Sequence, residues 1–147
     1  MTAIPEGFAP HTRPSPVTDP WQPLLARQTG EAFELGFEVR AAHCNGRDLL
    51  HGGVLAALAD NAMGLSLGVV LEAQGSRHGS GAVSGIVTTT LSLDYLDMAR
   101  PGDWVEIRPR VIKAGGGSGV VDALVVAGDG RVLSRANAVF KVLRAAP

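Results

Sequence analysis

The sequence predicts an α+β domain in which a strongly curved antiparallel sheet wraps around one long helix. Two observations support this fold class. A long apolar segment at residues 53–73 is rich in Ala and Leu, and five segments have the pattern of β-strands, one before it and four after it. A helix that is apolar on nearly every side has to be covered all round, and a curved sheet would supply that cover. We expect a single domain without internal repeats.

The N-terminal segment, residues 1–17, contains four prolines and predicts an extended arm or a disordered lead. We expect nothing catalytic there and place the folded domain at residues 18–147. Residues 18–28 predict a short helix that Thr18 or Asp19 caps.

Residues 31–40 predict a strand with one buried side, because hydrophobic and charged residues alternate along them. The side expected to be buried carries Phe33, Leu35, Phe37 and Val39. The strand segments after the helix are residues 83–97, 103–114, 119–128 and 131–143, separated by ARPGD, GGGS and GDG. The last two separators are typical of hairpin turns, so these segments should form an antiparallel meander.

Composition excludes several classes of protein. Of the 147 residues, 46% are hydrophobic and 18% charged, which is typical of a globular domain. A net charge of -1 and the absence of a run of Lys or Arg argue against nucleic-acid binding. The single Cys44 cannot form an internal disulfide, and the N-terminus lacks the features of a signal peptide, so we expect a cytoplasmic protein. Residues 54–71 are long enough to span a membrane, but Asp60 at their centre argues against it.

The predicted start of the long helix offers an anion site. If the helix begins near Gly52 or Gly53, its first backbone N–H groups lack intrahelical partners and the helix dipole adds positive charge there. Two glycines leave room for an oxyanion to reach these amides. The alternative is that the glycines only make a tight turn into the helix.

Asp60 stands alone in its own helix. Its neighbours three and four residues away are Ala56, Ala57, Met63 and Gly64, none of which can pair with it. Because burying an unpaired carboxylate costs free energy, this pattern indicates a nucleophile or general base lined by small residues. The structural alternative is that Asp60 accepts hydrogen bonds from the backbone, Ser or Thr groups of a neighbouring element.

The spacing of these groups has a consequence for assembly. Asp60 lies eight residues beyond Gly52, about 12 Å along a helix axis. A nucleophile and an oxyanion donor must both lie within about 3 to 3.5 Å of the reacting group. If both act on one carbonyl, they most simply come from two subunits, with the helices antiparallel across a two-fold axis.

The stretch NGRDLLHGGVLAALADNAMG, with Asn45, His51, Gly52, Gly53 and Asp60 at these intervals, resembles the signature of hotdog-fold acyl-CoA thioesterases. Within these, it is similar to the PaaI-like and 4-hydroxybenzoyl-CoA thioesterase-like group. The resemblance continues through VTTTLSLDYL, ARPGD and GRVLSRANAVFKVL, and so covers roughly residues 30 to 143.

The resemblance implies a role for each matching position. Asp60 would attack the thioester carbonyl or activate water to do so, and the Gly52 N–H would stabilise the oxyanion. His51 and Asn45 would orient the thioester or the water. Thr88 matches a Ser or Thr near the acid, with Thr89 as its rival because a strand alternates its faces. The substrate would be a small or medium acyl-CoA, aromatic or short aliphatic, with no cofactor. Such proteins are at least homodimers with shared sites, and often homotetramers.

Two departures from the family pattern concern coenzyme A. Asp97 and Met98 stand where relatives commonly have Arg and Pro, and the KAGGGSG segment is unusually rich in glycine. Gly53 would line the substrate path, and three cations remain candidates for the CoA phosphates: Arg77, Arg100 and Lys113. Each could equally be a solvated surface charge.

The remaining alternatives concern metals and chemistry. His43, Cys44 and His51 are clustered, but their spacing fits no zinc pattern, so we expect no metal. Cys44 lacks an obvious third partner for a nucleophilic role. A non-catalytic acyl-thioester-binding hotdog dimer is the main alternative function. A hotdog dehydratase is a weaker one, because that reaction usually employs a different arrangement of Asp and His.

Overall fold

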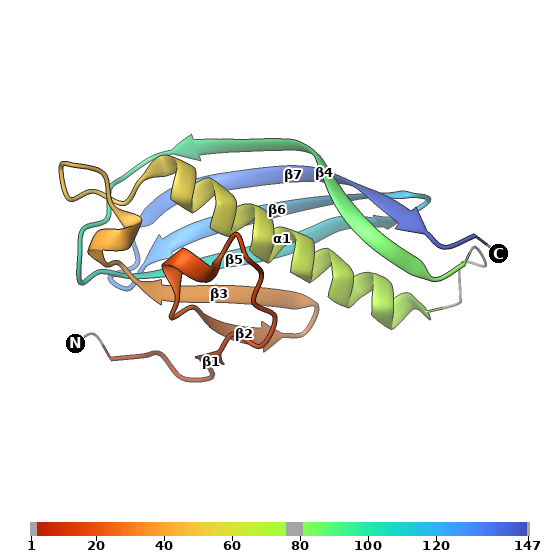
Figure 1. The fold of residues 1–147 in the computed structure, drawn as a ribbon, viewed down its shortest axis with the longest axis horizontal. Helices are drawn as coiled ribbons and strands as arrows, with labels where there is room; N and C mark the ends of the chain where they lie inside the picture. The colour runs from red at the N-terminus through yellow and green to blue at the C-terminus, as the bar shows by residue number, and fades with distance from the viewer. Residues whose placement is uncertain (1–2, 76–80, 147) are drawn as a thin grey trace.

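The computed structural model describes residues 3–75 and 81–146. One long helix lies across a wide antiparallel sheet (Figure 1). The elements in chain order are β1 (Ala9–Pro10), η1 (Asp19–Trp21), β2 (Leu25–Thr29), β3 (Ala32–Glu38), η2 (Ala41–His43), α1 (Gly52–Gln74), β4 (Val83–Tyr95), β5 (Trp104–Gly115), β6 (Ser118–Ala127) and β7 (Val132–Arg144). The strand order is β1-β2-β3-β5-β6-β7-β4. This is the predicted α+β hotdog architecture, and the long helix is confirmed. The prediction of a four-strand meander is wrong: β5, β6 and β7 are consecutive neighbours, but β3 occupies the other edge of β5, so β4 pairs with β7 at the edge of the sheet.

The prediction of a helix over residues 18–28 is wrong. Only η1 is helical, and the residues from Leu25 onward form β2, which pairs with β3. Pro23 has no backbone N–H and excludes helical conformation for the residue before it, so the helix cannot continue. Thr29 pairs with Ala32, and Gly30 in the connecting turn has a φ of +56°, which glycine adopts without steric cost. Pairing with β3 therefore decided the structure of this segment.

The core lies between α1 and the sheet. One face of the helix is buried. Its buried residues recur at intervals of three and four and are Leu55, Leu58, Ala59, Ala62, Met63, Ser66, Leu67, Val70 and Leu71. The close approach of helix and sheet depends on Gly119 of β6, because a Cβ there would lie 2.4 Å from Leu67 Cδ2. The opposite face of α1, which carries Asp60, is only half-buried.

The start of the N-terminal arm packs on the outer face of the sheet, and further along the arm the buried His11 ring lies 5.2 Å from the Phe33 ring. β1 pairs with β2, and the ring of Phe8 meets Trp104 edge to face at 5.3 Å between centroids. A Cβ at Gly36 of β3 would lie 2.5 Å from the Trp104 ring, so only glycine fits beneath this aromatic pair. Over the described residues 3–17, the strand structure is confined to Ala9–Pro10.

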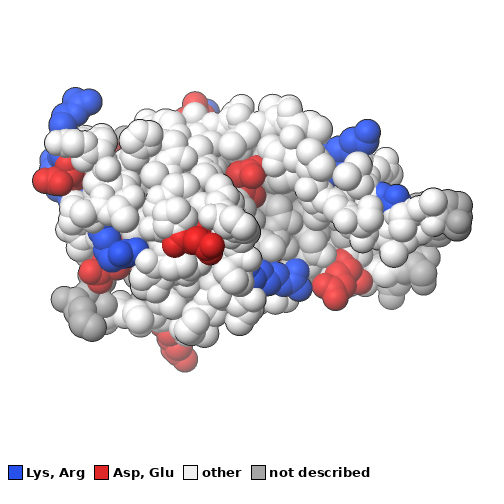
Figure 2. All heavy atoms as spheres, viewed as in Figure 1, with Lys and Arg blue, Asp and Glu red and all other residues white. Residues whose placement is uncertain are grey.

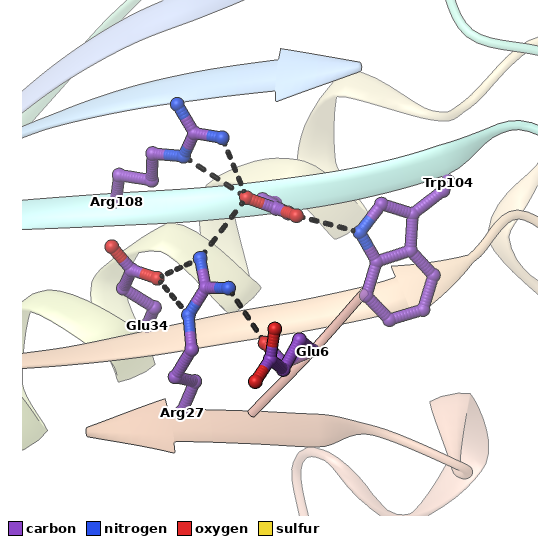
Figure 3. A network of polar contacts seen from close by, with 6 residues as sticks. Glu6, Arg27, Glu34, Trp104 and Arg108 are labelled. Carbon is purple, nitrogen blue, oxygen red and sulfur yellow. Dashed lines mark hydrogen bonds and ion pairs between the residues drawn. The ribbon is translucent and has the colours of Figure 1, made fainter. Parts of the chain in front are cut away.

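A network of ion pairs holds the arm in place (Figure 3). Arg27 of β2 lies 2.6 Å from Glu34 and 3.6 Å from Glu106, and it donates to the Glu6 carbonyl at 2.9 Å. Glu106 also accepts hydrogen bonds from Arg108 and from the Trp104 indole. Burial acts to raise the pKa of Glu106, but the indole, Arg108 and Arg27 together hold that pKa below its ordinary value.

Charge is scattered over the face that carries α1. Figure 2 shows Lys and Arg on this face as separate groups rather than as one patch. Among the described residues, α1 is the one helix long and apolar enough to cross a membrane, and half of its most apolar window is buried inside the fold. The core helix of a soluble protein passes the same test.

Candidate active site

The centre of the candidate site is a contact between α1 and β4. The Thr88 hydroxyl donates a hydrogen bond to Asp60 Oδ1 at 2.7 Å. Asp60 is half-buried rather than fully buried, and it is not unpartnered, so the structural alternative of a Ser or Thr donor from a neighbouring element is present. Among the described residues, no hydrogen bond to Oδ2 is found. The carboxylate is therefore held through one oxygen while the other is left for a substrate or water.

A β-bulge decides which threonine faces Asp60. The pairing of β4 with β7 is irregular between Thr88 and Thr90, where Thr89 is the extra residue. Before the bulge, Ile86 and Thr88 of β4 pair with the buried Val142 and Phe140 of β7. Beyond it, the odd-numbered Leu91, Leu93 and Tyr95 pair with the buried Ala138, Ala136 and Ser134. The Thr89 hydroxyl instead donates to the Val139 carbonyl at 3.0 Å. The structure thus places Thr88 at the acid and turns Thr89 away.

The helix begins with the expected exposed amides. α1 starts at Gly52, and His51 is its N-cap residue. His51 Nδ1 accepts a hydrogen bond from the Gly53 N–H at 2.9 Å, so this amide is occupied. No partner for the Gly52 N–H is found in the part of the chain that the structure describes. Gly52 therefore offers a free donor at the positive end of the helix dipole.

Tyr95 is a site residue that the sequence analysis missed. It is the last residue of β4, and its hydroxyl donates to the Gly52 carbonyl at 2.6 Å. Its ring lies against Gly52, where a Cβ would be 3.1 Å from Tyr95 Cζ. Because Tyr95 faces the helix only after the register change at Thr89, strand alternation read from the sequence could not have placed it there.

Asn45 holds its own loop. Its side-chain oxygen accepts hydrogen bonds from the Arg47 N–H at 2.9 Å and the Leu49 N–H at 3.3 Å. The bridge between Cys44 and Leu50 closes this loop, which leads into His51. The contacts of the Asn45 oxygen are therefore internal to the loop that positions the helix start.

Of the three predicted phosphate ligands, Arg100 lies just before β5 and Lys113 near the end of that strand, so these two are not brought together. Arg100 is exposed, and its backbone N–H donates to Asp103. Lys113 lies in the β5–β6 hairpin, where its ammonium donates to the Ser118 hydroxyl at 2.9 Å. Arg77 lies outside the described residues.

Asp97, one of the departures from the family pattern, pairs with Arg131. The guanidinium of Arg131 lies 3.2 Å from Asp97, 3.8 Å from Asp103 and 2.8 Å from Asp129. The backbone hydrogen bond from Met98 and the contact with Arg131 lower the pKa of Asp97. This acid therefore belongs to a surface cluster with a cation at its centre.

Two other features, a hollow on the sheet and the Cys44 thiol, are not part of the chemistry at Asp60. A hollow of about 660 Å³ on the outer side of the sheet is lined by charged and polar side chains, including Arg108, Arg110 and Asp122. Burial raises the pKa of the Cys44 thiol, which disfavours the thiolate that a nucleophile needs. Within residues 3–75 and 81–146, no group of three or more His, Cys, Asp or Glu is placed to hold a metal ion.

Known structures share this fold. The chain has a TM-score of 0.70 to a Streptococcus pneumoniae hypothetical thioesterase with coenzyme A, at 20% identity over 85% of this chain and 94% of that one. To the Escherichia coli PaaI protein of the phenylacetic acid degradation operon, the TM-score is 0.64 at 21% identity, over 77% and 73% of the chains. These likenesses show that the chain has the hotdog fold.

Sequence comparison gives the family. The Thioesterase superfamily matches residues 48–134, which include the helix, β4 and most of the meander, so the chain belongs to that superfamily. The chain is also 33% identical over 141 residues to PA0474 of Pseudomonas aeruginosa, a candidate esterase, covering 95% of this chain and 98% of that protein.

Proposed function

We propose that this protein hydrolyses a small or medium acyl-CoA thioester, aromatic or short aliphatic, at a site formed by two subunits. The observation that carries the proposal is the Asp60 carboxylate, held by Thr88 through one oxygen and half-exposed on the helix that begins with the Gly52 N–H. The coenzyme A in the structure of the Streptococcus pneumoniae protein supports CoA as the carrier.

The proposed reaction uses Asp60 of one subunit and the Gly52 N–H of the other. Asp60 takes a proton from water while the water oxygen forms a bond to the thioester carbonyl carbon. The carbonyl oxygen becomes an oxyanion and accepts a hydrogen bond from the Gly52 N–H. The intermediate then collapses, the C–S bond breaks, and the thiolate takes up the proton. In the alternative route Asp60 attacks the carbonyl carbon itself, the C–S bond breaks as the thiolate leaves, and water then cleaves the resulting anhydride to release the acid and restore the carboxylate. Neither route requires a cofactor or metal.

Assembly through β4 would complete the site. This strand is 13 residues long and lies at the edge of the sheet, where a long unprotected strand tends to pair with another chain. Its exposed apolar side chains include Val83, Val87 and Leu91. Antiparallel pairing of two such edges across a two-fold axis would set the α1 helices antiparallel. Asp60 of one subunit would then face the Gly52 end of the other, and two dimers could form a tetramer.

The decisive experiment combines a substrate screen with Asp60→Asn. Purified protein is assayed on aromatic and straight-chain acyl-CoAs of increasing length. We expect hydrolysis of at least one, and a loss of about 10²- to 10⁴-fold in kcat for Asp60→Asn, with an unchanged fold and dimer. Activity retained in that variant would overturn the role of the carboxylate. Binding of acyl-CoA without turnover by the wild type would instead favour the non-catalytic dimer.

A further inference from the structure

The peptide unit between Gly52 and Gly53 is held from both sides. Its carbonyl oxygen accepts the Tyr95 hydroxyl at 2.6 Å, and its N–H donates to His51 Nδ1 at 2.9 Å. The two side chains come from different parts of the fold, since Tyr95 ends β4 and His51 precedes the helix. One peptide plane is thus fixed by a strand and by a cap residue at once.

These two hydrogen bonds, together called the clamp, act at a helix start that is made of two glycines. Glycine lowers helix stability by about 1 kcal/mol per residue relative to alanine, and α1 begins with two glycines. Because neither has a Cβ, rotation about the Gly52 backbone bonds is resisted by few steric contacts. An oxyanion donor is effective only when its direction is fixed before the reaction. The peptide unit that carries the Gly52 N–H is held by the hydrogen bond from the Leu55 N–H to the His51 carbonyl at 3.0 Å, and the Tyr95 and His51 side chains hold the next unit along the chain.

Gly52 and Tyr95 also fit one another sterically. A Cβ at position 52 would lie 3.1 Å from Tyr95 Cζ and 3.3 Å from its hydroxyl oxygen, closer than most real Cβ contacts. The glycine therefore makes room for the tyrosine ring as well as for the substrate. Burial raises the pKa of the Tyr95 hydroxyl, so it remains a protonated donor at neutral pH.

We propose that Tyr95 is a positioning residue for the oxyanion donor: by holding the Gly52 carbonyl while His51 holds the Gly53 N–H of the same peptide unit, it fixes the direction of the neighbouring Gly52 N–H. This inference rests on the proposed thioesterase function and adds a residue to it. Tyr95 need not touch the reacting atoms, because it acts through the backbone. The aromatic ring of Tyr95 packs against Gly52, and its hydroxyl fixes the orientation of the Gly52 carbonyl.

The test is Tyr95→Phe, which keeps the ring and removes the hydroxyl. We expect kcat on the best acyl-CoA to fall about 3- to 10-fold, the factor that one neutral hydrogen bond supplies, while KM changes less than about 2-fold. Exchange of the Gly53 amide hydrogen, followed by NMR, should accelerate by a similar factor. The melting temperature should fall by no more than about 4 °C.

Thr89→Val is the matched control. It also removes a hydroxyl from β4 that donates to a backbone carbonyl, but that carbonyl belongs to Val139 rather than to the helix start. We expect its kcat and its Gly53 exchange to equal those of the wild type. An equal fall in kcat in both variants would show a general effect on β4 and overturn the inference.

Other outcomes separate this inference from the proposed function. Wild-type kcat and Gly53 exchange in Tyr95→Phe would overturn the positioning role while leaving the thioesterase assignment intact. A rise in KM at constant kcat would also overturn it, since Tyr95 would then bind substrate directly. If Asp60→Asn retains full activity, the proposed function fails. The Gly53 exchange rate in Tyr95→Phe then still decides whether the clamp exists, and unchanged exchange would overturn it.

Discussion

The hydroxyl of Thr88 lies 2.7 Å from Asp60 Oδ1 and joins the edge strand of the sheet to the central helix. Thr88 lies on the same face of β4 as Ile86, and the bulge at Thr89 reverses the faces of the strand beyond it. The sequence left Thr88 and Thr89 as rivals for the residue beside the acid, and this contact assigns the role to Thr88. The orientation of the Asp60 carboxylate therefore depends on Thr88.

Removing this hydroxyl should impair catalysis more than stability. For Thr88→Val we expect kcat on the best acyl-CoA to fall about 10-fold, because a hydrogen bond to a charged group contributes about 1.5 to 3 kcal/mol and this one is partly exposed. Thr89→Val, assayed in parallel, should remain at the wild-type rate. Equal rates in wild type and Thr88→Val would show that the carboxylate needs no orientation from β4.

Disrupting the β4 edge should separate the subunits and abolish activity together. Val87 is 48% exposed on this strand, and a lysine at an exposed edge opposes strand pairing. We expect Val87→Lys to shift the mass measured by sedimentation toward the monomer and to lower thioesterase activity in the same concentration range. Val132→Lys on β7, away from this edge and 40% exposed, is the control. A fully active monomer would contradict the shared site.

The contact between Gly119 and Leu67 should be intolerant of a methyl group. A Cβ at position 119 would lie 2.4 Å from a fully buried side chain, so Gly119→Ala should reduce the free energy of unfolding by about 1 to 3 kcal/mol in urea titrations. Gly46→Ala has nothing within 4 Å of the added Cβ and should change it by less than about 1 kcal/mol. Equal stability of the two variants would mean that α1 is free to shift.

The Glu106 network should stabilise the fold without serving the site. Glu106→Gln leaves Arg27 and Arg108 without the shared carboxylate, and we expect a loss of about 1 to 3 kcal/mol of unfolding free energy. The exposed Glu72 on α1 offers a matched Glu→Gln control, expected to stay within about 0.5 kcal/mol of the wild type. The kcat of Glu106→Gln below its melting temperature should be that of the wild type; a large fall would connect the arm to catalysis.

Stability should decrease as the pH falls below about 6.5, the ordinary value for histidine. Burial lowers the pKa of His43, whose Nδ1 accepts from the Arg40 N–H while Nε2 faces the Trp21 carbonyl, so the folded state holds a neutral ring. Between the lowered pKa and 6.5 the unfolded chain binds more protons, and the unfolding free energy therefore decreases with falling pH. Urea midpoints at pH 7.5 and 5.5 measure this.

His43→Gln provides the comparison for this pH effect. The variant should be less stable at pH 7.5, because it loses the buried ring contacts, but it should lose less further stability on acidification. His11, whose pKa burial also lowers, contributes in the same direction and remains in both proteins. An identical pH dependence of the unfolding free energy in wild type and variant would show that His43 does not cause the loss of stability at low pH.

Local pattern determined much of this protein. The alternation through Phe33 and Phe37 predicted β3, and the apolar length of residues 53–73 predicted α1 to within a residue at each end. Glycine-rich separators predicted the hairpins between β5, β6 and β7. These features depend on periodicity and turn chemistry within a short window, which is why the sequence alone indicates them. The spacing of His51, Gly52 and Asp60 is equally local, and it pointed to the family.

Tertiary structure decided what depends on a partner strand. The residues from Leu25 onward form β2 because their backbone pairs with β3, although the local pattern favoured a helix. The bulge at Thr89 exists only in the pairing with β7, and it sets both the donor to Asp60 and the position of Tyr95 over Gly52. Because strand alternation has a period of two, one inserted residue moves every later side chain to the other face. The sequence alone therefore indicated the acid and the helix start, and only the folded sheet decided which side chains hold them.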